Sequence, residues 1–293
     1  MEKLAKQLKH EERTVLIEHV SESSSSLVNR ITNYVTNRQN EDGGYTFCQF
    51  AESNAQDTYY GLAILDSLNS SFPNVEKTVS WLNELRTENI FSTYNVTNAL
   101  SLCKAKISTV LRKRITSQVS SLECFDPIEG VSELSSEFTT TYMALELANL
   151  LNLETKNEAL AKWILQSRNK DNGFGSQNHS NINSTYYALA SLNLLKILIH
   201  DLHETTAFVR KCEKPQGGFT VIPIGTMPYM EHTYYGALSL ELLGEKSRYP
   251  EKTINFVLEC QNRNGGFARS DLGISTFENT YYAISIMKKL NFL

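Results

Sequence analysis

The chain has 293 residues, of which 41% are hydrophobic and 20% charged, as in ordinary globular proteins. A net charge of −4 gives no field that would attract nucleic acid or anionic lipid, and no apolar run approaches the ~20 residues of a membrane span. The first residues are charged throughout, and the five cysteines follow no metal-like spacing, which favours reduced thiols. We therefore expect a cytoplasmic protein that binds no nucleic acid and has no membrane span.

Residues 1–22 are predicted to form an N-terminal helix and hinge, and residues 23–293 a single domain built from a repeat. Six Thr-Tyr pairs precede apolar helical runs and follow one another at intervals of 35 to 48 residues. The pairs are Thr58-Tyr59, Thr93-Tyr94, Thr141-Tyr142, Thr185-Tyr186, Thr233-Tyr234 and Thr280-Tyr281. Periods of 20–50 residues are typical of stacked or circular arrays of small structural units.

A glycine-aromatic turn is the second marker of the repeat. The segments "QNEDGGYTF" (39–47), "RNKDNGFGS" (168–176), "EKPQGGFTV" (213–221) and "QNRNGGFAR" (261–269) each precede a Thr-Tyr pair. An amphipathic stretch leads into the turn, as in residues 249–261, and a more apolar stretch follows the pair. The unit is therefore an outer amphipathic helix, a glycine turn and an inner apolar helix.

Six such units can form an open solenoid or a closed ring. A solenoid needs polar caps on its terminal repeats, whereas the sixth repeat ends in its apolar inner helix at "KKLNFL". We therefore predict an all-α (α/α)6 toroid, with six inner helices inside six outer ones.

Parallel inner helices would gather six N-termini, each with unpaired N–H groups and a partial positive charge, at one opening. Five of the six residues directly before the threonines are N-cap types, which predicts a capping role for this column, and His232 is the outlier. The column consists of Asp57, Ser92, Thr140, Ser184, His232 and Asn279.

The first tyrosines of the repeats are predicted to line a chamber just inside that opening. They are Tyr59, Tyr94, Tyr142, Tyr186, Tyr234 and Tyr281. Such a wall suits an apolar ligand with an anionic head, or a carbocation that faces aromatic rings. The alternative is that the tyrosines only fill space between helices. The irregular segment 221–230 is predicted to act as a lid over the opening.

The glycine-aromatic turn followed by a Thr-Tyr helix resembles the prenyltransferase and squalene-cyclase repeat, over roughly residues 25–293. That family includes the β subunits of protein prenyltransferases and the class II terpene cyclases. The resemblance implies an isoprenoid or another apolar small molecule as ligand, and the prenyltransferases also imply a protein partner.

Protein prenyltransferases place a zinc-binding histidine directly before such a threonine, and "MEHTYYGALSL" resembles that stretch with His232 at the metal position. The family's other zinc ligands map onto Asn183 and Thr185, which replace neither a carboxylate nor a thiolate. The segment that matches the family's basic diphosphate clamp, residues 175–183, holds no Arg or Lys. We therefore expect no zinc, and Mg²⁺ only where a diphosphate is bound.

Class II terpene cyclases carry Asp-x-Asp-Asp-Thr at this helix start. "NAQDTYYG" resembles it in Asp57-Thr58, but Gln56 stands at the position of the proton-donating acid. Glu231 and Glu278 are acids at the start of the fifth and sixth inner helices, and an acid in an apolar chamber can stay protonated. The predicted catalytic residues are Glu231 with His232, Glu278 and Asp57. The alternative is that the glutamates serve only the first helical turns.

Three functions remain open from the sequence. The first is an isoprenoid-processing enzyme of the terpene cyclase type, with Glu231 as the acid and the tyrosines as the wall of its funnel. The second is a non-catalytic toroid that binds an apolar molecule or a protein. The third is a zinc-independent, prenyltransferase-like protein.

Overall fold

Helices of two kinds alternate along the computed structural model, which describes residues 25–123, 136–155, 157–199 and 202–293. The inner helices are α2 (Ala55–Ser67), α4 (Ile90–Leu102), α6 (Glu137–Leu150), α8 (Ile182–Leu194), α10 (Met230–Leu242) and α12 (Phe277–Lys289). The outer helices are residues 25–36, α3 (Val75–Glu84), α5 (Thr109–Glu123), α7 (Asn157–Gln166), α9 (His203–Cys212) and α11 (Pro250–Glu259). A short 3-10 helix, η1 (Ser176–Asn178), lies in the fourth repeat. The predicted helix and hinge over residues 1–22 lie outside the described residues.

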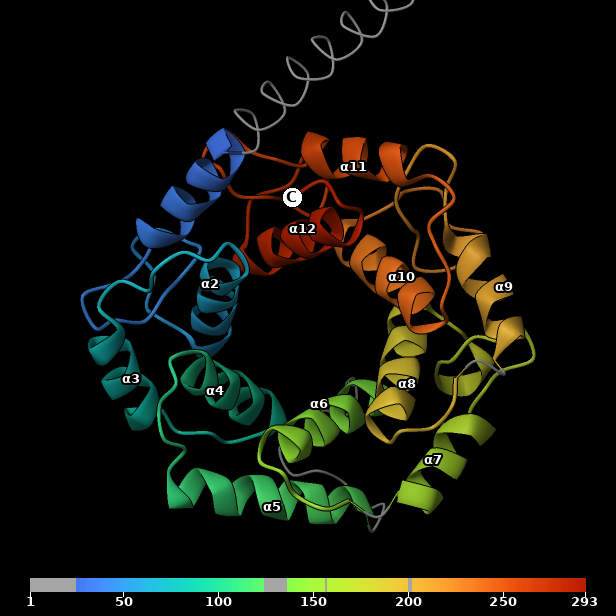
Figure 1. The fold of residues 1–293 in the computed structure, drawn as a ribbon, viewed down its shortest axis with the longest axis horizontal. Helices are drawn as coiled ribbons and strands as arrows, with labels where there is room; N and C mark the ends of the chain where they lie inside the picture. The colour runs from blue at the N-terminus through green and yellow to red at the C-terminus, as the bar shows by residue number, and fades with distance from the viewer. Residues whose placement is uncertain (1–24, 124–135, 156, 200–201) are drawn as a thin grey trace, which may run out of the picture.

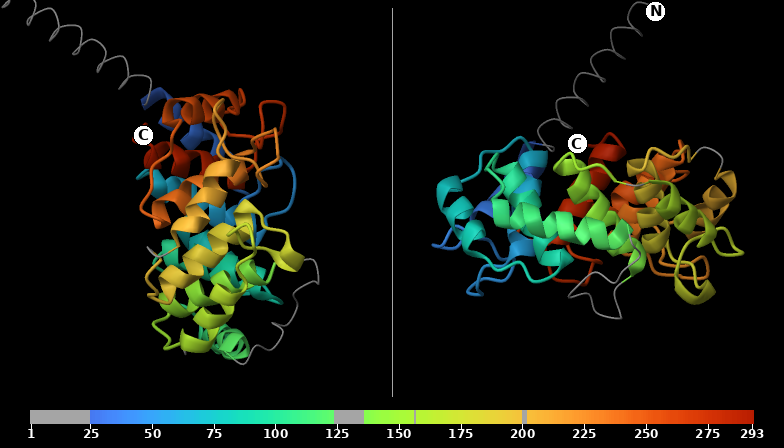
Figure 2. Two further views of the ribbon diagram at one scale, coloured as in Figure 1. Left: turned by 90° about the vertical axis from the view of Figure 1, so that its right-hand side faces the viewer. Right: turned by 90° about the horizontal axis from the view of Figure 1, so that it is seen from below.

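The two sets of helices form concentric rings (Figure 1), and Figure 2 shows the resulting flat disc edge-on. Each inner helix packs against the next, from α2 through α4, α6, α8 and α10 to α12, and α12 packs back against α2. Across this seam the Phe277 ring meets Tyr34 and Tyr45 at centroid distances of 5.4 Å and 6.4 Å. The predicted all-α toroid with a closed ring is confirmed.

Burial explains why the outer helices are amphipathic and the inner ones are not. On α11 the buried residues Thr253, Ile254 and Val257 form one stripe at three- and four-residue spacing. On α8, by contrast, buried residues run almost without a break from Ile182 to Leu192, because other helices cover the inner ring on several sides. Among the helices of the described ranges, none has both the length and the apolar character that a membrane span requires.

The glycine turns bring the chain from the outer ring to the inner ring. Isolated β-bridges close four of them, pairing Gln39 with Tyr45, Arg168 with Phe174, Glu213 with Phe219 and Gln261 with Phe267. Gly217 has φ +105°, and a Cβ there would lie 2.2 Å from the Lys252 carbonyl oxygen. The turn backbone therefore lies directly against the next outer helix, which leaves no room for a side chain.

The repeated threonines join each glycine turn to its inner helix. In four repeats the amide of the aromatic residue after the turn donates to the threonine Oγ1, at 2.9 to 3.1 Å. The pairs are Tyr45–Thr58, Phe174–Thr185, Phe219–Thr233 and Phe267–Thr280. Because the amide and the hydroxyl are buried, this bond fixes the turn on the helix.

The predicted N-cap column is wrong by one helical turn. The capping side chains belong to residues three positions earlier: Asn54, Asn89, Asn181 and Thr276 accept from the amides of Asp57, Ser92, Ser184 and Asn279 at 2.8 to 3.1 Å. Asp57 and its equivalents are thus third helical residues that donate to a cap. His232 occupies the same position on α10, where Tyr229 is the N-cap residue without a side-chain bond.

Candidate functional site

Ten tyrosines from the inner helices gather in one aromatic cluster. The first tyrosines of the six repeats are Tyr59, Tyr94, Tyr142, Tyr186, Tyr234 and Tyr281, and four repeats add a second tyrosine, namely Tyr60, Tyr187, Tyr235 and Tyr282. Ring centroids of neighbours lie between 4.3 Å, for Tyr234 and Tyr282, and 6.2 Å, for Tyr281 and Tyr282. We call these ten residues the tyrosine cluster.

The second tyrosines form a chain of hydroxyl groups that ends on a carboxylate. Tyr187 and Tyr235 share a hydrogen bond of 2.7 Å, and Tyr235 and Tyr282 one of 3.0 Å. Tyr282 in turn donates to Glu278 Oε1 at 2.9 Å, and Tyr60 donates to the same oxygen at 3.3 Å. Residues of α2, α8, α10 and α12 are therefore joined through one polar chain inside an aromatic cluster.

A second carboxylate, Glu146 of α6, serves the first tyrosines. The Tyr94 hydroxyl donates to Glu146 Oε2 at 2.6 Å, and Tyr142 also hydrogen-bonds this carboxylate. Glu146 was not among the residues predicted from the sequence. The sequence feature that could have identified it is a carboxylate four residues after Tyr142, at a position that is uncharged on the other inner helices. The equivalent residues there are Ala63, Asn98, Ala190, Leu238 and Ser285.

Burial raises the pKa of all ten tyrosines of the cluster, to about 12 for Tyr235. Deprotonation of the hydroxyl groups is therefore disfavoured throughout the cluster. At neutral pH they are uncharged donors and acceptors at the tips of an aromatic wall.

Glu278 is the predicted acid that the fold brings into this cluster. Burial raises its pKa above the ordinary value, and the charges of Glu231 and Asp57 add to the effect, while the hydrogen bonds from Tyr282 and Tyr60 oppose it. In the part of the chain that the structure describes, Glu278 has no ion pair. It is a half-buried carboxyl group whose protonated form is favoured by its surroundings.

Glu231 and His232, predicted to act together, lie at the rim beside a basic residue. Arg269 Nε donates to Glu231 Oε1 at 2.7 Å, and the guanidinium also stacks 4.1 Å from the centroid of the Tyr229 ring. His232 Nε2 lies 3.6 Å from the same carboxylate oxygen. Glu231 is thus ion-paired and not surrounded by the tyrosine cluster, because the next glycine turn supplies Arg269.

His232 is 6% exposed, and burial lowers its pKa, with Glu231 opposing and Arg269 adding to the effect. Its Nδ1 has no hydrogen-bond partner within the described ranges. A buried, uncharged imidazole packed edge-on against Tyr229, at 5.7 Å between centroids, fits a packing role at the start of α10.

Asp57 supports a loop. Its Oδ2 accepts from Asn54 Nδ2 at 2.7 Å and from the Phe47 amide at 3.2 Å. Burial raises the pKa of Asp57, while these bonds oppose the shift. The carboxylate therefore ties the segment after the first glycine turn to α2.

A zinc ion of the prenyltransferase kind does not fit these residues. Thr185 Oγ1 already accepts from the Phe174 amide and donates to the Asn181 carbonyl, so it is committed to the turn. Among the residues described, no group of three or more His, Cys, Asp or Glu side chains could hold a metal ion. His232 lies beside Glu231, but the Glu231 carboxylate is already ion-paired with Arg269.

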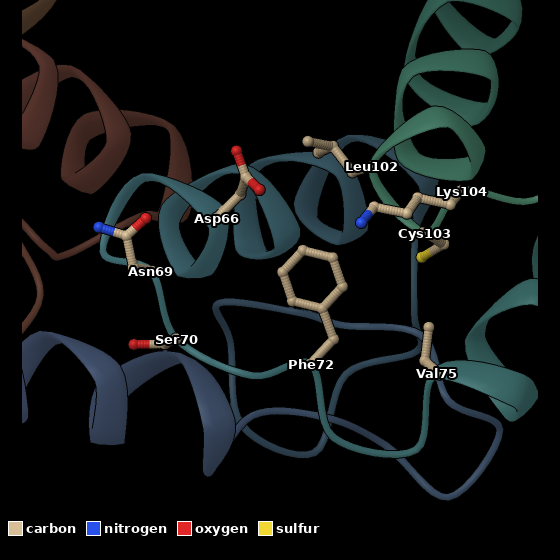
Figure 3. Close-up of a pocket in the computed structure, with 8 residues that line it drawn as sticks. All are labelled: Asp66, Asn69, Ser70, Phe72, Val75, Leu102, Cys103 and Lys104. Carbon is tan, nitrogen blue, oxygen red and sulfur yellow. The ribbon is translucent and has the colours of Figure 1, made fainter.

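Two cavities lie at the C-terminal ends of the inner helices. One of about 160 Å³ is bounded by Tyr59 and Tyr281 of the cluster together with Ala63, Asp66, Ser67, Asn98, Ser101 and Leu102. The other, of about 370 Å³, shares Asp66 and Leu102 with it and extends over Phe72, Val75 and Cys103 (Figure 3). Two members of the tyrosine cluster, Tyr59 and Tyr281, thus also form part of the wall of an open space.

The segment predicted as a lid is fastened at its base. The Ile182 amide donates to the Val221 carbonyl at 2.9 Å, and Lys214 Nζ donates to the Pro223 carbonyl at 2.8 Å. Its tip exposes Ile224 by 86%, and the loop before α12 exposes Leu272 by 93%. A role as a lid stays a prediction.

Known proteins share this architecture. The model of the prenyltransferase alpha-alpha toroid domain matches residues 12–89, 83–196 and 176–292. No curated protein sequence matches the chain significantly.

Among solved structures, Candida albicans protein geranylgeranyltransferase-I complexed with GGPP is similar, with a TM-score of 0.70 and 16% identity over 90% of this chain and 91% of that one. The type II terpene cyclase MstE from Scytonema gives a TM-score of 0.65 and 13% identity over 92% and 98%. A variant of that cyclase in complex with its substrate geranylgeranyl dihydroxybenzoate gives 0.61 and 14% over 92% and 98%. These identities show a shared fold, and the three family matches together span most of the sequence. The chain belongs to the prenyltransferase alpha-alpha toroid family.

Proposed function

We propose that this protein is an isoprenoid-processing enzyme of the terpene cyclase type, with the tyrosine cluster as its binding site and Glu278 as its acid. The observation that carries the proposal is the place of Glu278: its Oε1 accepts from Tyr282 at 2.9 Å and from Tyr60 at 3.3 Å, inside the aromatic cluster and without an ion pair in the described residues. Glu231, the acid favoured from sequence, is bound to Arg269 instead.

The ligand class is supported by the similar structures. The geranylgeranyltransferase was solved in complex with GGPP, and the cyclase variant in complex with its substrate geranylgeranyl dihydroxybenzoate. An apolar isoprenoid chain matches a site whose walls are tyrosine rings with hydroxyl tips.

The proposed chemistry begins with a proton transfer. The Glu278 carboxyl group gives its proton to one carbon of an isoprenoid double bond, so a C–H bond forms and the other carbon becomes a carbocation. The hydroxyl groups of Tyr282 and Tyr60 stabilise the resulting carboxylate, and the ring faces of the cluster stabilise the cation. Loss of a proton from the cationic product to the carboxylate restores the acid.

The test compares the two candidate acids, with geranylgeraniol as the probe in D₂O. Deuterium incorporation into the product is measured by mass spectrometry for the wild type, Glu278→Gln and Glu231→Gln. We expect Glu278→Gln to lose about 10²–10⁴-fold in rate, as for a general acid, and Glu231→Gln to stay within a few-fold. A larger loss of rate in Glu231→Gln than in Glu278→Gln would assign the acid role to Glu231. Circular dichroism of both variants checks that they fold.

A second candidate function is a non-catalytic toroid that binds an apolar molecule or a protein. It is favoured by the mutual contacts of the tyrosine rings, such as the 4.3 Å stacking of Tyr234 on Tyr282, which occupy part of the space a large substrate would need. Binding of geranylgeraniol without any deuterium incorporation would select this function.

A further inference from the structure

The charges of the inner helices are unevenly distributed between the rims and the interior. At the rims, two carboxylates are neutralised by ion pairs: Glu231 pairs with Arg269, and Glu241 pairs with Lys289. In the interior, Glu146 and Glu278 have no ion pair with any residue of the described ranges, and tyrosine hydroxyl groups are their hydrogen-bond donors. Because Glu278 is held in its protonated form as the proposed acid, Glu146 is the carboxylate that supplies negative charge among the tyrosines, without a fixed counter-charge from these ranges.

Glu146 is the main source of this negative charge. Its charge is among the causes that raise the pKa of Tyr59, Tyr94, Tyr142, Tyr186 and Tyr281, which belong to five different inner helices. Geometry joins Glu146 to the 160 Å³ cavity through Tyr94, whose hydroxyl donates to Glu146 at 2.6 Å and whose ring lies 5.9 Å from that of Tyr59 in the cavity wall. Ala63 and Asn98, which occupy the position of Glu146 on α2 and α4, also line this cavity.

The aromatic rings add to the negative electrostatic potential of this site. The face of each ring is negative, so a set of rings around a carboxylate attracts an organic cation. A diphosphate, with its negative charges, would be repelled by Glu146, whose hydrogen-bond donor is a tyrosine and not a basic side chain. Lys104 lines the 370 Å³ cavity, and Lys288 donates to the carbonyl of Ser67, which borders the 160 Å³ cavity. Both lysines are exposed, so solvent screens their charges.

The size of the space fits one compact cationic group. A cavity of about 150 Å³ holds a molecule the size of benzene, and the cavity beside Tyr59 and Tyr281 measures about 160 Å³. The adjoining space of about 370 Å³, over Phe72, Val75 and Leu102 (Figure 3), can take an attached apolar chain.

We infer that the tyrosine cluster selects an apolar ligand that bears an organic ammonium group, held between Tyr59, Tyr281 and Glu146, over a prenyl diphosphate. The inference rests on the proposed function, since it takes the cluster as the ligand site, and it adds the sign of the ligand's charge and a residue, Glu146, that positions it.

The experiment measures dissociation constants by calorimetry for three probes that differ only in the head group: farnesyltrimethylammonium, farnesol and farnesyl diphosphate. For the wild type we expect the ammonium probe to bind about tenfold more tightly than farnesol, and the diphosphate to bind most weakly. Glu146→Gln is expected to remove most of the preference for the ammonium probe over farnesol, measured as the ratio of the two dissociation constants. The matched control is Glu241→Gln, because that carboxylate lies at the rim of α10 and is paired with Lys289.

Each outcome of these measurements supports or overturns the inference. Tightest binding of the diphosphate, or an ammonium preference that survives Glu146→Gln, overturns it. Equal binding of farnesol and the ammonium probe overturns it and leaves the proposed function standing. Failure of all three probes to bind overturns both. The comparison of probes on the wild type needs no variant, so it holds even if Glu146→Gln does not fold.

Discussion

The Thr233 hydroxyl accepts a 3.1 Å hydrogen bond from the Phe219 amide and donates one of 2.8 Å to the Tyr229 carbonyl. Thr233 is fully buried, as are its equivalents Thr58, Thr93, Thr185 and Thr280. The same side chain thus completes the first turn of the inner helix and holds the glycine turn against it. Four repeats make this connection between the turn and the helix, which explains why the threonine recurs with the glycine turn.

Replacement of that threonine should therefore weaken the repeat. Thr233→Val keeps the shape but leaves the buried Phe219 amide without a partner, which costs about 1–3 kcal/mol of unfolding free energy. Thr233→Ser keeps the hydroxyl and should lose less. Urea unfolding of both variants measures the difference, and equal losses would show that the methyl group, rather than the hydrogen bond, matters.

The closure of the ring can be tested at a glycine. Gly265 has φ +94°, and a Cβ there would lie 2.4 Å from the Arg30 carbonyl oxygen of the first outer helix. Gly244 has φ +74°, and a Cβ there would meet no described atom within 4 Å. Gly244→Ala should cost only the backbone strain, about 1 kcal/mol, whereas Gly265→Ala should cost about 3 kcal/mol or more because the first and last repeats must separate. Equal melting temperatures for the two variants would contradict the contact between the ends of the ring.

A buried ion pair predicts a pH dependence of stability. Burial alone would raise the pKa of Glu213, but the hydrogen bonds from Arg248, Ser247 and Arg210 outweigh it and lower the pKa below the ordinary 4.5. A lowered pKa means that the stabilisation is complete above about pH 4.5 and is lost as the pH falls through the folded-state value. Glu213→Gln should cost about 2 kcal/mol at pH 7.

Thermal unfolding of wild type and Glu213→Gln from pH 7 to pH 3 checks this. The stabilities of the two proteins should converge in acid. A difference that stays constant across the range would assign the loss to packing and not to charge.

The raised pKa of Glu278 has the opposite sign. Because the folded-state pKa lies above the ordinary 4.5, ionisation of Glu278 destabilises the folded state. The contribution of this group to the free energy of unfolding therefore declines as the pH rises from about 4.5. Glu278→Gln should therefore raise the melting temperature at pH 7 while it removes activity. Turnover of the wild type should fall as the pH rises through the same pKa, because the acid must be protonated. A rate that increases across this range would mean that the group acts as a base.

The toroid could be predicted from the sequence because its signals are local and recur along the chain. The Thr-Tyr pairs occur in six repeats and the glycine turns in four, and the alternation of amphipathic and apolar helices reflects the outer and inner rings. The caps were misplaced because the polar column before the threonines resembled a cap, although Asn54, Asn89 and Asn181 stood one turn earlier.

The site was harder to predict, because it depends on contacts between repeats. The sequence indicated both Glu231 and Glu278, and what separates them is Arg269 in the glycine turn of the next repeat. The grouping of Tyr187, Tyr235 and Tyr282 into one hydroxyl chain likewise joins residues 47 and 48 positions apart. No local pattern carries that information.

The most direct test of the central claim, that an isoprenoid binds within the tyrosine cluster, is photo-crosslinking with a diazirine-bearing farnesol analogue followed by peptide mapping. We expect labels on the inner helices α2, α10 and α12, which carry Tyr59, Tyr234 and Tyr281, and loss of those labels with excess farnesol. Labels confined to the exposed apolar loop residues Phe50, Ile224 and Leu272 would contradict it.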